Sequence, residues 1–220
     1  MRNRFVGDVG DFGKYGLLRA LCGINPPDEP RLSLAVIWYR NEGKQFDYVA
    51  QPEKFADCDP ELFLKLKTLV EDDSRTVESI EQGDILGAST DFHHQPVVTK
   101  ADIVFLDPDK GLAFTDKQRS SRAYADLERA NLDSNQTVVI YQSFGRVEHE
   151  KQMASWQRDV KALLPVHANP RVLRYRPLHP RAFIILPSRR NTDLIDRRLQ
   201  DLLNGPWQQH FSEFSSEASR

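Results

Sequence analysis

The chain has 220 residues, of which 40% are hydrophobic and 28% charged, and its formal net charge is −2. These values are ordinary for a globular protein and allow one well-packed domain. The sequence shows no apolar run of membrane-spanning length and no signal-peptide core. Its two cysteines, Cys22 and Cys58, form no CxxC motif, which disfavours structural zinc and predicts a reducing, cytoplasmic location.

The charge is unevenly distributed along the chain. Residues 117–199 contain 16 Lys and Arg against 8 Asp and Glu, so this segment carries +8 and the remainder −10. Clustered cations are what neutralising the phosphates of RNA or DNA requires. The segment is therefore a candidate nucleic-acid surface, and a solvated arginine-rich face is an equal alternative.

The first distinctive stretch is FVGDVGDFGKYGLLRAL at residues 5–21, in which glycine recurs at every third position. This density suits backbone that approaches another group closely or takes positive φ. Asp11 is expected to cap a helix that contains Lys14. Such a helix N-terminus suits a polar or anionic ligand, although a glycine-rich lead-in to an ordinary helix is the alternative. A phosphate-binding P-loop is excluded, because Tyr15 follows Lys14 where Ser or Thr is needed.

The rest of the chain alternates between apolar strand patterns and amphipathic helix patterns. Strands are expected at residues 32–39, 76–80, 103–106 and 137–141. Helices are expected at 59–70, where Asp59 and Pro60 form a start signal, and at 117–132, 147–164 and 192–203. Residues 172–176 and 182–186 read as an antiparallel hairpin, and the tail after residue 211 is expected to fray.

This order predicts a single α/β domain over residues 1–211, with a frayed tail at 212–220. The expected architecture is a doubly wound, mostly parallel, Rossmann-like sheet of six strands with a C-terminal antiparallel hairpin. Ligands of such sheets bind beyond the carboxyl ends of the strands, where the polar turns fall. We therefore expect residues 7–14 to lie against the turn at 107–111.

The motifs carry a resemblance to known families. The Gly/Asp-rich segment with Lys14 resembles the N-terminal segment of bacterial methyltransferases that modify adenine N6 in large-subunit ribosomal RNA. Their later acidic turn resembles Glu81-Gln-Gly-Asp84, and their catalytic Asp-Pro-Pro-Tyr resembles Asp107-Pro-Asp-Lys110. The chain also looks like a member of a bacterial family with the motifs GDxGDxxKxGLLR and LDPDxGL.

The resemblance implies a class I fold, whose sheet has an antiparallel strand near one edge, and S-adenosylmethionine as cofactor. The implied cofactor-binding residues are Gly7, Asp8, Gly10, Asp11, Lys14, Tyr39, Gly43 and Asp84. Asp107, Pro108 and Asp109 would face the reacting centre, and Ser143, Gly145 and Arg146 would line the acceptor side. The turn after Asp107 has no second proline and no aromatic to stack on a flipped base, so the methyl acceptor stays open.

Two other functions fit the same residues. Asp107 and Asp109 flank a proline at a strand end, and Asp8 and Asp11 could join them to hold Mg²⁺ in a phosphoesterase or nuclease. A proline turn flanked by solvated acids would give the same pattern. The third hypothesis is a non-catalytic ligand-binding domain that kept the fold.

Overall fold

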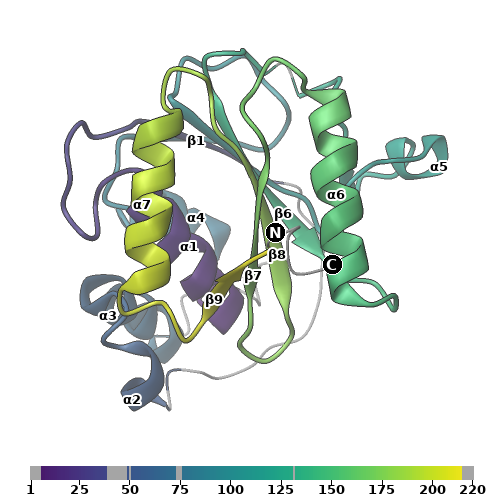
Figure 1. The fold of residues 1–220 in the computed structure, drawn as a ribbon. Coiled ribbons are helices and arrows are strands. Elements are labelled where there is room, and N and C mark those ends of the chain that lie inside the picture. The colour runs from purple at the N-terminus through teal and green to yellow at the C-terminus, as the bar shows by residue number, and fades with distance from the viewer. Residues whose placement is uncertain (1–5, 39–48, 50, 73–75, 131, 215–220) are drawn as a thin grey trace.

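The computed structural model of the chain describes residues 6–38, 49, 51–72, 76–130 and 132–214. Its centre is a seven-stranded sheet in the order β2-β1-β3-β6-β8-β7-β9, with helices on both faces (Figure 1). The strands are β1 (Leu34–Trp38), β2 (Thr90–His93), β3 (Ile103–Asp107), β6 (Thr137–Ser143), β7 (Arg171–Tyr175), β8 (Arg181–Leu186) and β9 (Phe211–Glu213). A separate parallel pair is formed by β4 (Gly111–Leu112) and β5 (Tyr124–Ala125). The helices are α1 (Val9–Leu21), α2 (Pro52–Phe55), α3 (Pro60–Glu71), α4 (Val77–Gln82), α5 (Asp116–Arg119), α6 (His149–Leu163) and α7 (Thr192–Asn204).

The order of the strands along the sheet reverses at one point. Strands β2, β1, β3 and β6 run parallel, and β8 runs antiparallel to both of its neighbours, β6 and β7. The chain passes from β1 to β2 on one side and then to β3 on the other, so the strand order reverses at β1. Open α/β sheets bind ligands outside the carboxyl ends of the strands at such a point. The expected α/β class, mostly parallel sheet and closing hairpin are confirmed.

The hydrophobic core has two parts, one on each face of the sheet. Helices α1, α3 and α7 pack on one face against alternate strand residues such as Phe105. Helix α6 packs on the other face, against residues such as Leu106 (Figure 1). Because β1 and β3 are covered on both faces, their sequences are continuous apolar runs. Among the helices that the structure describes, none is both long enough and apolar enough to cross a membrane.

The prediction of a strand at residues 76–80 is wrong, because this segment forms α4. The side chain of Thr76 caps the helix by accepting a hydrogen bond from Ser79 N at 3.0 Å. Val77 and Ile80 are both buried, and in a short run this burial suits a helical turn as well as a strand. The strand that pairs with the outer side of β1, opposite β3, is β2, whose sequence Thr-Asp-Phe-His is too polar to stand out.

Two further segments differ from the sequence prediction. The helix expected at 117–132 is limited to α5. A capping box at Thr115 begins this helix, and the two residues that follow it, Ser120 and Ser121, are poor helix formers. The tail expected to fray from residue 212 instead begins with an edge strand, because β9 pairs with β7 and raises the strand number from six to seven. Residues 215–220 lie outside the described part of the chain.

The glycines of α1 let this helix lie close to its neighbours. All 13 residues of α1 are buried. A Cβ atom added at Gly10 would lie 2.3 Å from the guanidinium carbon of Arg181, and one at Gly13 would lie 2.5 Å from the ring of Tyr175. At Gly16 it would lie 2.2 Å from the ring of Trp207. The glycine repeat therefore removes side chains where α1 meets the sheet and the segment after α7.

Replacing Gly16 by alanine is expected to destabilise the fold. The new methyl group would overlap the indole of Trp207, which is buried with Phe12 at 4.9 Å and cannot move freely. We expect a loss of about 2 kcal/mol, although alanine favours a helix by about 1 kcal/mol. Thermal melting would then show a Tm lower by about 4–8 °C. Gly145→Ala is the control, because its Cβ would meet only the flexible side chain of Gln152 at 3.3 Å; equal Tm values for both variants would contradict close packing at Gly16.

Candidate functional site

Three side chains at the carboxyl ends of neighbouring strands lie on the α1 side of the sheet. Trp38 ends β1 and Asp107 ends β3, and the two residues are partners in the strand register. Asp107 follows Phe105 by two positions, so it points to the face that α1 covers. Tyr141, near the end of the adjacent strand β6, packs on the same face. These residues form one row along the edge where ligands of such sheets bind.

Lys14 connects α1 to this row. Its Nζ donates to Asp11 Oδ1 at 2.9 Å and to Asp107 Oδ2 at 2.9 Å, across 93 residues of sequence. Each of the three side chains is at most 8% exposed. The prediction that residues 7–14 meet the turn after β3 is therefore confirmed.

The start of α1 adds two further charged groups. Asp8, and not Asp11 as expected, is the N-cap, because its Oδ1 accepts from Asp11 N at 2.8 Å. Asp11 lies in the first turn and accepts from Gly7 N at 3.1 Å. Arg181, the first residue of β8, places Nη2 3.5 Å from Asp8 Oδ2. The cluster of Asp8, Asp11, Lys14, Asp107 and Arg181, here called the Lys14 cluster, thus contains three acids and two bases.

The electrostatics of the cluster follow from burial and from this excess of acids. Burial raises the pKa of Asp11 to about 6, and the carboxylates of Asp8 and Asp107 add to the rise, whereas Lys14 opposes it. Burial disfavours the charged form of Lys14, but attraction by Asp107 and Asp11 outweighs it and raises the pKa above its usual value. Lys14 therefore stays an ammonium and cannot serve as a general base, whereas Asp11 can exchange a proton near neutral pH.

Aromatic rings surround the ammonium. Lys14 Nζ lies 5.7 Å from the ring of Trp38, 5.8 Å from Tyr15 and 5.9 Å from Tyr141. Burial raises the pKa of the Tyr15 phenol well above its usual value, so Tyr15 stays neutral. One buried donor of this region, Trp38 Nε1, has no hydrogen-bond acceptor among the described residues. A polar ligand or a water molecule that accepts from it would supply the missing bond.

The turn after Asp107 is tied to the end of β6. Ser143 donates from its backbone N and its Oγ to Lys110 O, at 3.2 and 2.7 Å. Gln142 Oε1 accepts from Leu112 N at 2.8 Å, so the turn containing Pro108 and Asp109 is held beside β6. The structure thus brings Ser143 to the turn after Asp107.

Other residues predicted for the site lie elsewhere or outside the described residues. Gly145 and Arg146 are exposed on the loop that leads to α6. Asp84 lies in the loop before β2, whose first residue, Thr90, pairs with the first residue of β1. This loop therefore lies at the amino edge of the sheet. The expected strand at 76–80 would have put Asp84 at the carboxyl edge, but that segment is the helix α4. Tyr39 and Gly43 fall outside the described residues.

Sequence reasoning missed three members of the site: Trp38, Tyr141 and Arg181. Trp38 and Tyr141 sit at ends of apolar strands, and alternation along a strand could have marked the face they share with Asp107. No local signal identifies Arg181, because its position beside Asp8 depends on the pairing of β8 with β6.

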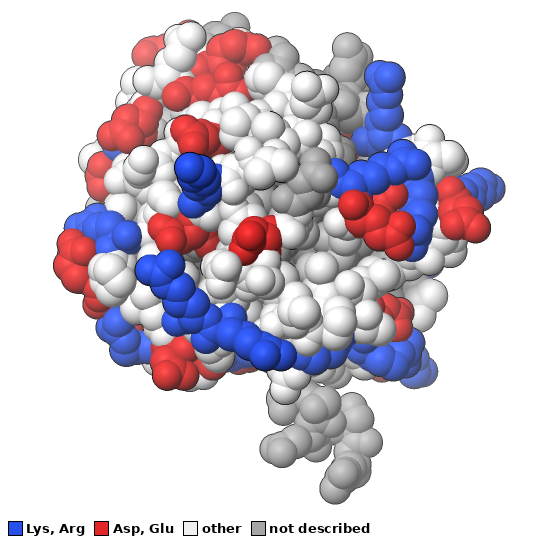
Figure 2. All heavy atoms as spheres, turned by 90° about the horizontal axis from the view of Figure 1, so that it is seen from above, with Lys and Arg blue, Asp and Glu red and all other residues white. Residues whose placement is uncertain are grey.

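The structure bears on two further expectations, a metal site built from Asp side chains and a basic surface for nucleic acid. Among the residues described, no group of three His, Cys, Asp or Glu side chains is arranged to hold a metal ion. Several arginines of the basic segment are engaged internally: Arg171 pairs with Glu213, Arg198 pairs with Asp28, and Arg176 donates to a backbone carbonyl of β9. On the face drawn in Figure 2, basic and acidic side chains are interspersed.

No protein-family model matches the chain, and no curated protein or solved structure matches it either. A functional assignment therefore depends on the chemistry and geometry of the Lys14 cluster.

Proposed function

We propose that the chain is an S-adenosylmethionine-dependent methyltransferase-like protein whose cofactor binds at the carboxyl edge of β1 and β3. The observation that carries this proposal is the Lys14 cluster, which has more acids than bases and in which all members except the half-buried Arg181 are buried, at the point where the strand order reverses. The antiparallel position of β8 between β6 and β7 also agrees with the methyltransferase type of sheet implied by the resemblance.

The charge of the cluster suits this cofactor. With three carboxylates against two cations, the cluster has a formal charge of −1 when all its groups are ionised. The sulfonium of S-adenosylmethionine is a cation, and both negative charge and aromatic faces attract cations. Methyl transfer is chiefly a positioning problem and needs no strong base. The permanent charge of Lys14 is therefore compatible with this chemistry.

The methyl acceptor is less well supported than the cofactor, and two alternative functions have less support than methyl transfer. RNA or DNA is one possible acceptor, through Arg146 and the part of the basic segment not engaged internally. A Mg²⁺-dependent phosphoesterase would use Asp107 and Asp109, but the ammonium of Lys14 already occupies the space between Asp11 and Asp107. A non-catalytic domain would bind the same cofactor without turnover.

Thermal melting with candidate ligands tests the proposal. S-adenosylhomocysteine at 100 times its Kd should stabilise the fold by about 2.7 kcal/mol, which raises Tm by roughly 5–10 °C. Asp84→Asn should give the same shift as the wild type, because Asp84 lies at the amino edge of the sheet. A shift with Mg²⁺ or Mn²⁺ alone would favour the phosphoesterase, and no shift with either adenosyl compound would contradict the proposed cofactor.

A further inference from the structure

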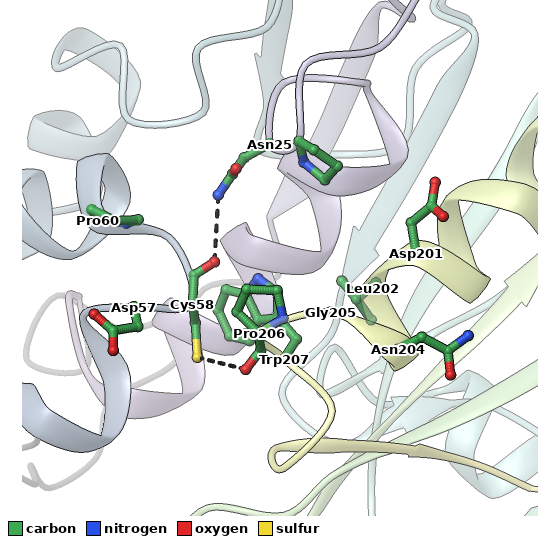
Figure 3. Close-up of a pocket in the computed structure, with 11 residues that line it drawn as sticks. Asn25, Asp57, Cys58, Pro60, Asp201, Leu202, Asn204, Gly205, Pro206 and Trp207 are labelled. Carbon is green, nitrogen blue, oxygen red and sulfur yellow. Dashed lines mark hydrogen bonds between the residues drawn. The ribbon is translucent and has the colours of Figure 1, made fainter.

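Two places in the molecule have room or polarity for a ligand, and they differ in their buried polar groups. The first is a cavity of about 400 Å³ at the C-terminal end of α7, where the carboxylates of Asp57 and Asp201 point outward (Figure 3). Among the described residues that line it, none has a buried polar side-chain atom without a partner. The second is the edge beside Lys14, where Trp38 is 1% exposed and its Nε1 has no acceptor among the described residues. A polar ligand is therefore expected at the Lys14 cluster.

Within this cluster, Asp11 is the acid whose charge depends most on a ligand. Its Oδ1 accepts from Lys14 Nζ at 2.9 Å and its Oδ2 from Gly7 N at 3.1 Å. The side chain is 4% exposed, so water contributes little to offsetting its charge. Lys14 is shared with Asp107, which accepts from the same Nζ at 2.9 Å. Asp11 therefore receives a fraction of the charge of one ammonium.

The charged and titratable groups around Asp11 and Lys14 come from four elements. They are Asp8, Lys14 and Tyr15 on α1, Asp107 on β3, Tyr141 on β6 and Arg181 on β8. Burial raises the pKa of both phenols, Tyr15 and Tyr141, so they stay neutral. The acids at the start of α3 bond to Arg19 in the second half of α1, and Arg198 of α7 donates to the carbonyl of the last residue of α1. Around Asp11 itself, three acids thus face two bases.

This excess of acid favours a bound proton in the absence of a ligand. Three buried carboxylates around two cations repel one another least when one of them is protonated. Asp11 is that acid, because burial raises its pKa to about 6. A ligand that brings a positive charge would reverse this preference, since an opposite charge nearby lowers the pKa of a carboxyl by about 1–3 units. Asp11 is already buried, so an uncharged ligand would add little desolvation and leave its proton in place.

We propose that Asp11 releases a proton when S-adenosylmethionine binds at the Lys14 cluster and keeps it when S-adenosylhomocysteine binds. The inference rests on the proposed function, because it needs the sulfonium of the cofactor near Asp107. The proton passes from the carboxyl of Asp11 to solvent, and no bond of the cofactor changes. At acidic pH the site therefore binds the product better, relative to the cofactor, than it does at neutral pH. This linkage makes pH a regulator of the proposed activity.

Calorimetric titration in two buffers of different ionisation enthalpy, phosphate and Bis-Tris, counts the released protons. At pH 6, S-adenosylmethionine should release about half a proton and S-adenosylhomocysteine about none. Between pH 7 and pH 5 the Kd of S-adenosylmethionine should rise about five- to tenfold, whereas that of S-adenosylhomocysteine should change less than about twofold. The ligands keep their own charges in this range, because α-amino groups titrate near 8 and α-carboxyl groups near 3.5.

Two variants identify the group that loses the proton. Asp11→Asn keeps the size of the side chain but cannot titrate, so S-adenosylmethionine should bind it without proton release and with the same Kd at pH 5 and pH 7. The matched control carries His93→Gln and His94→Gln, at the carboxyl end of β2, because histidine is the usual side chain that titrates near neutral pH. This control should release as much proton as the wild type.

The outcomes separate this inference from the proposed function. If both adenosyl compounds bind the wild type and neither releases a proton, the inference alone is wrong. Proton release that persists in Asp11→Asn, or that disappears in the histidine control, would also overturn it. If neither compound binds at any pH, the proposed function fails and the inference fails with it. The wild-type and histidine-control titrations decide the matter even where Asp11→Asn does not fold.

Discussion

Lys14→Met is expected to lower the free energy of unfolding by about 3–5 kcal/mol, a large part of the stability of a typical domain. The substitution keeps an unbranched side chain, one atom shorter than lysine, but leaves Asp11 and Asp107 without their shared cation. Both carboxylates are at most 5% exposed, so water cannot replace the ammonium at little cost. Denaturant titration followed by tryptophan fluorescence measures the loss.

Lys65→Met is the matched control for this variant. Lys65 also contacts two acids, Glu61 and Asp84, but these are 59% and 79% exposed, so the expected loss is below about 1 kcal/mol. If Lys14→Met were as stable as Lys65→Met, the Lys14 cluster would not hold α1 to the sheet.

The pH dependence of stability provides a second test of the cluster. The pKa of Asp11 is raised from 3.8 to about 6, so the folded state binds this proton more tightly than the unfolded state. The contribution of Asp11 to stability is therefore greatest below pH 4, falls as pH rises from about 4 to 6, and is constant above that. In Lys14→Met the fall should extend to higher pH, because the cation that opposes the rise in the pKa of Asp11 is gone.

The contact between residues 7–14 and Asp107 could be predicted because it depends on topology. Parallel strands have their carboxyl ends at one edge, and the apolar run 103–106 that ends in a polar turn assigned Asp107 to that edge. Residues 7–14 were assigned to the same side because they form a polar, glycine-rich stretch suited to a ligand. The same reasoning failed for Asp84, because a five-residue run with buried Val77 and Ile80 fits a helical turn as well as a strand. Short runs carry too few residues to separate the two periods.

The role of the α1 glycines was beyond the reach of sequence reasoning for a different reason. The repeat was correctly interpreted as backbone that approaches something closely, but what it approaches belongs to the distant residues Arg181, Tyr175 and Trp207. Only Gly7, with a φ of +73°, fits the expectation of an unusual backbone conformation. A pattern of small residues indicates that space is needed, whereas the fold decides which group fills it.

Asp107→Asn is expected to lower methyl transfer at least about a hundredfold while the fold survives. Asparagine keeps the shape of the side chain and an oxygen that can accept from Lys14 Nζ, so stability should fall by only about 1 kcal/mol. It removes one negative charge from the carboxyl edge of β3. The rate of an enzyme commonly falls by about a hundredfold or more when its active site loses one preorganised electrostatic group.

The two adenosyl compounds separate this effect from simple damage to the site. S-adenosylmethionine carries the sulfonium charge and S-adenosylhomocysteine does not, so Asp107→Asn should weaken the former more than the latter in calorimetric titration. Asp109→Asn, in the same turn, should leave the ratio of the two affinities unchanged, since Lys14 bonds to Asp107 and Asp11. In a phosphoesterase both substitutions would instead reduce Mg²⁺ affinity. Equal weakening of both adenosyl compounds by Asp107→Asn would show that Asp107 supports the pocket without sensing the charge of the cofactor, and the electrostatic basis of the proposed function would then be wrong.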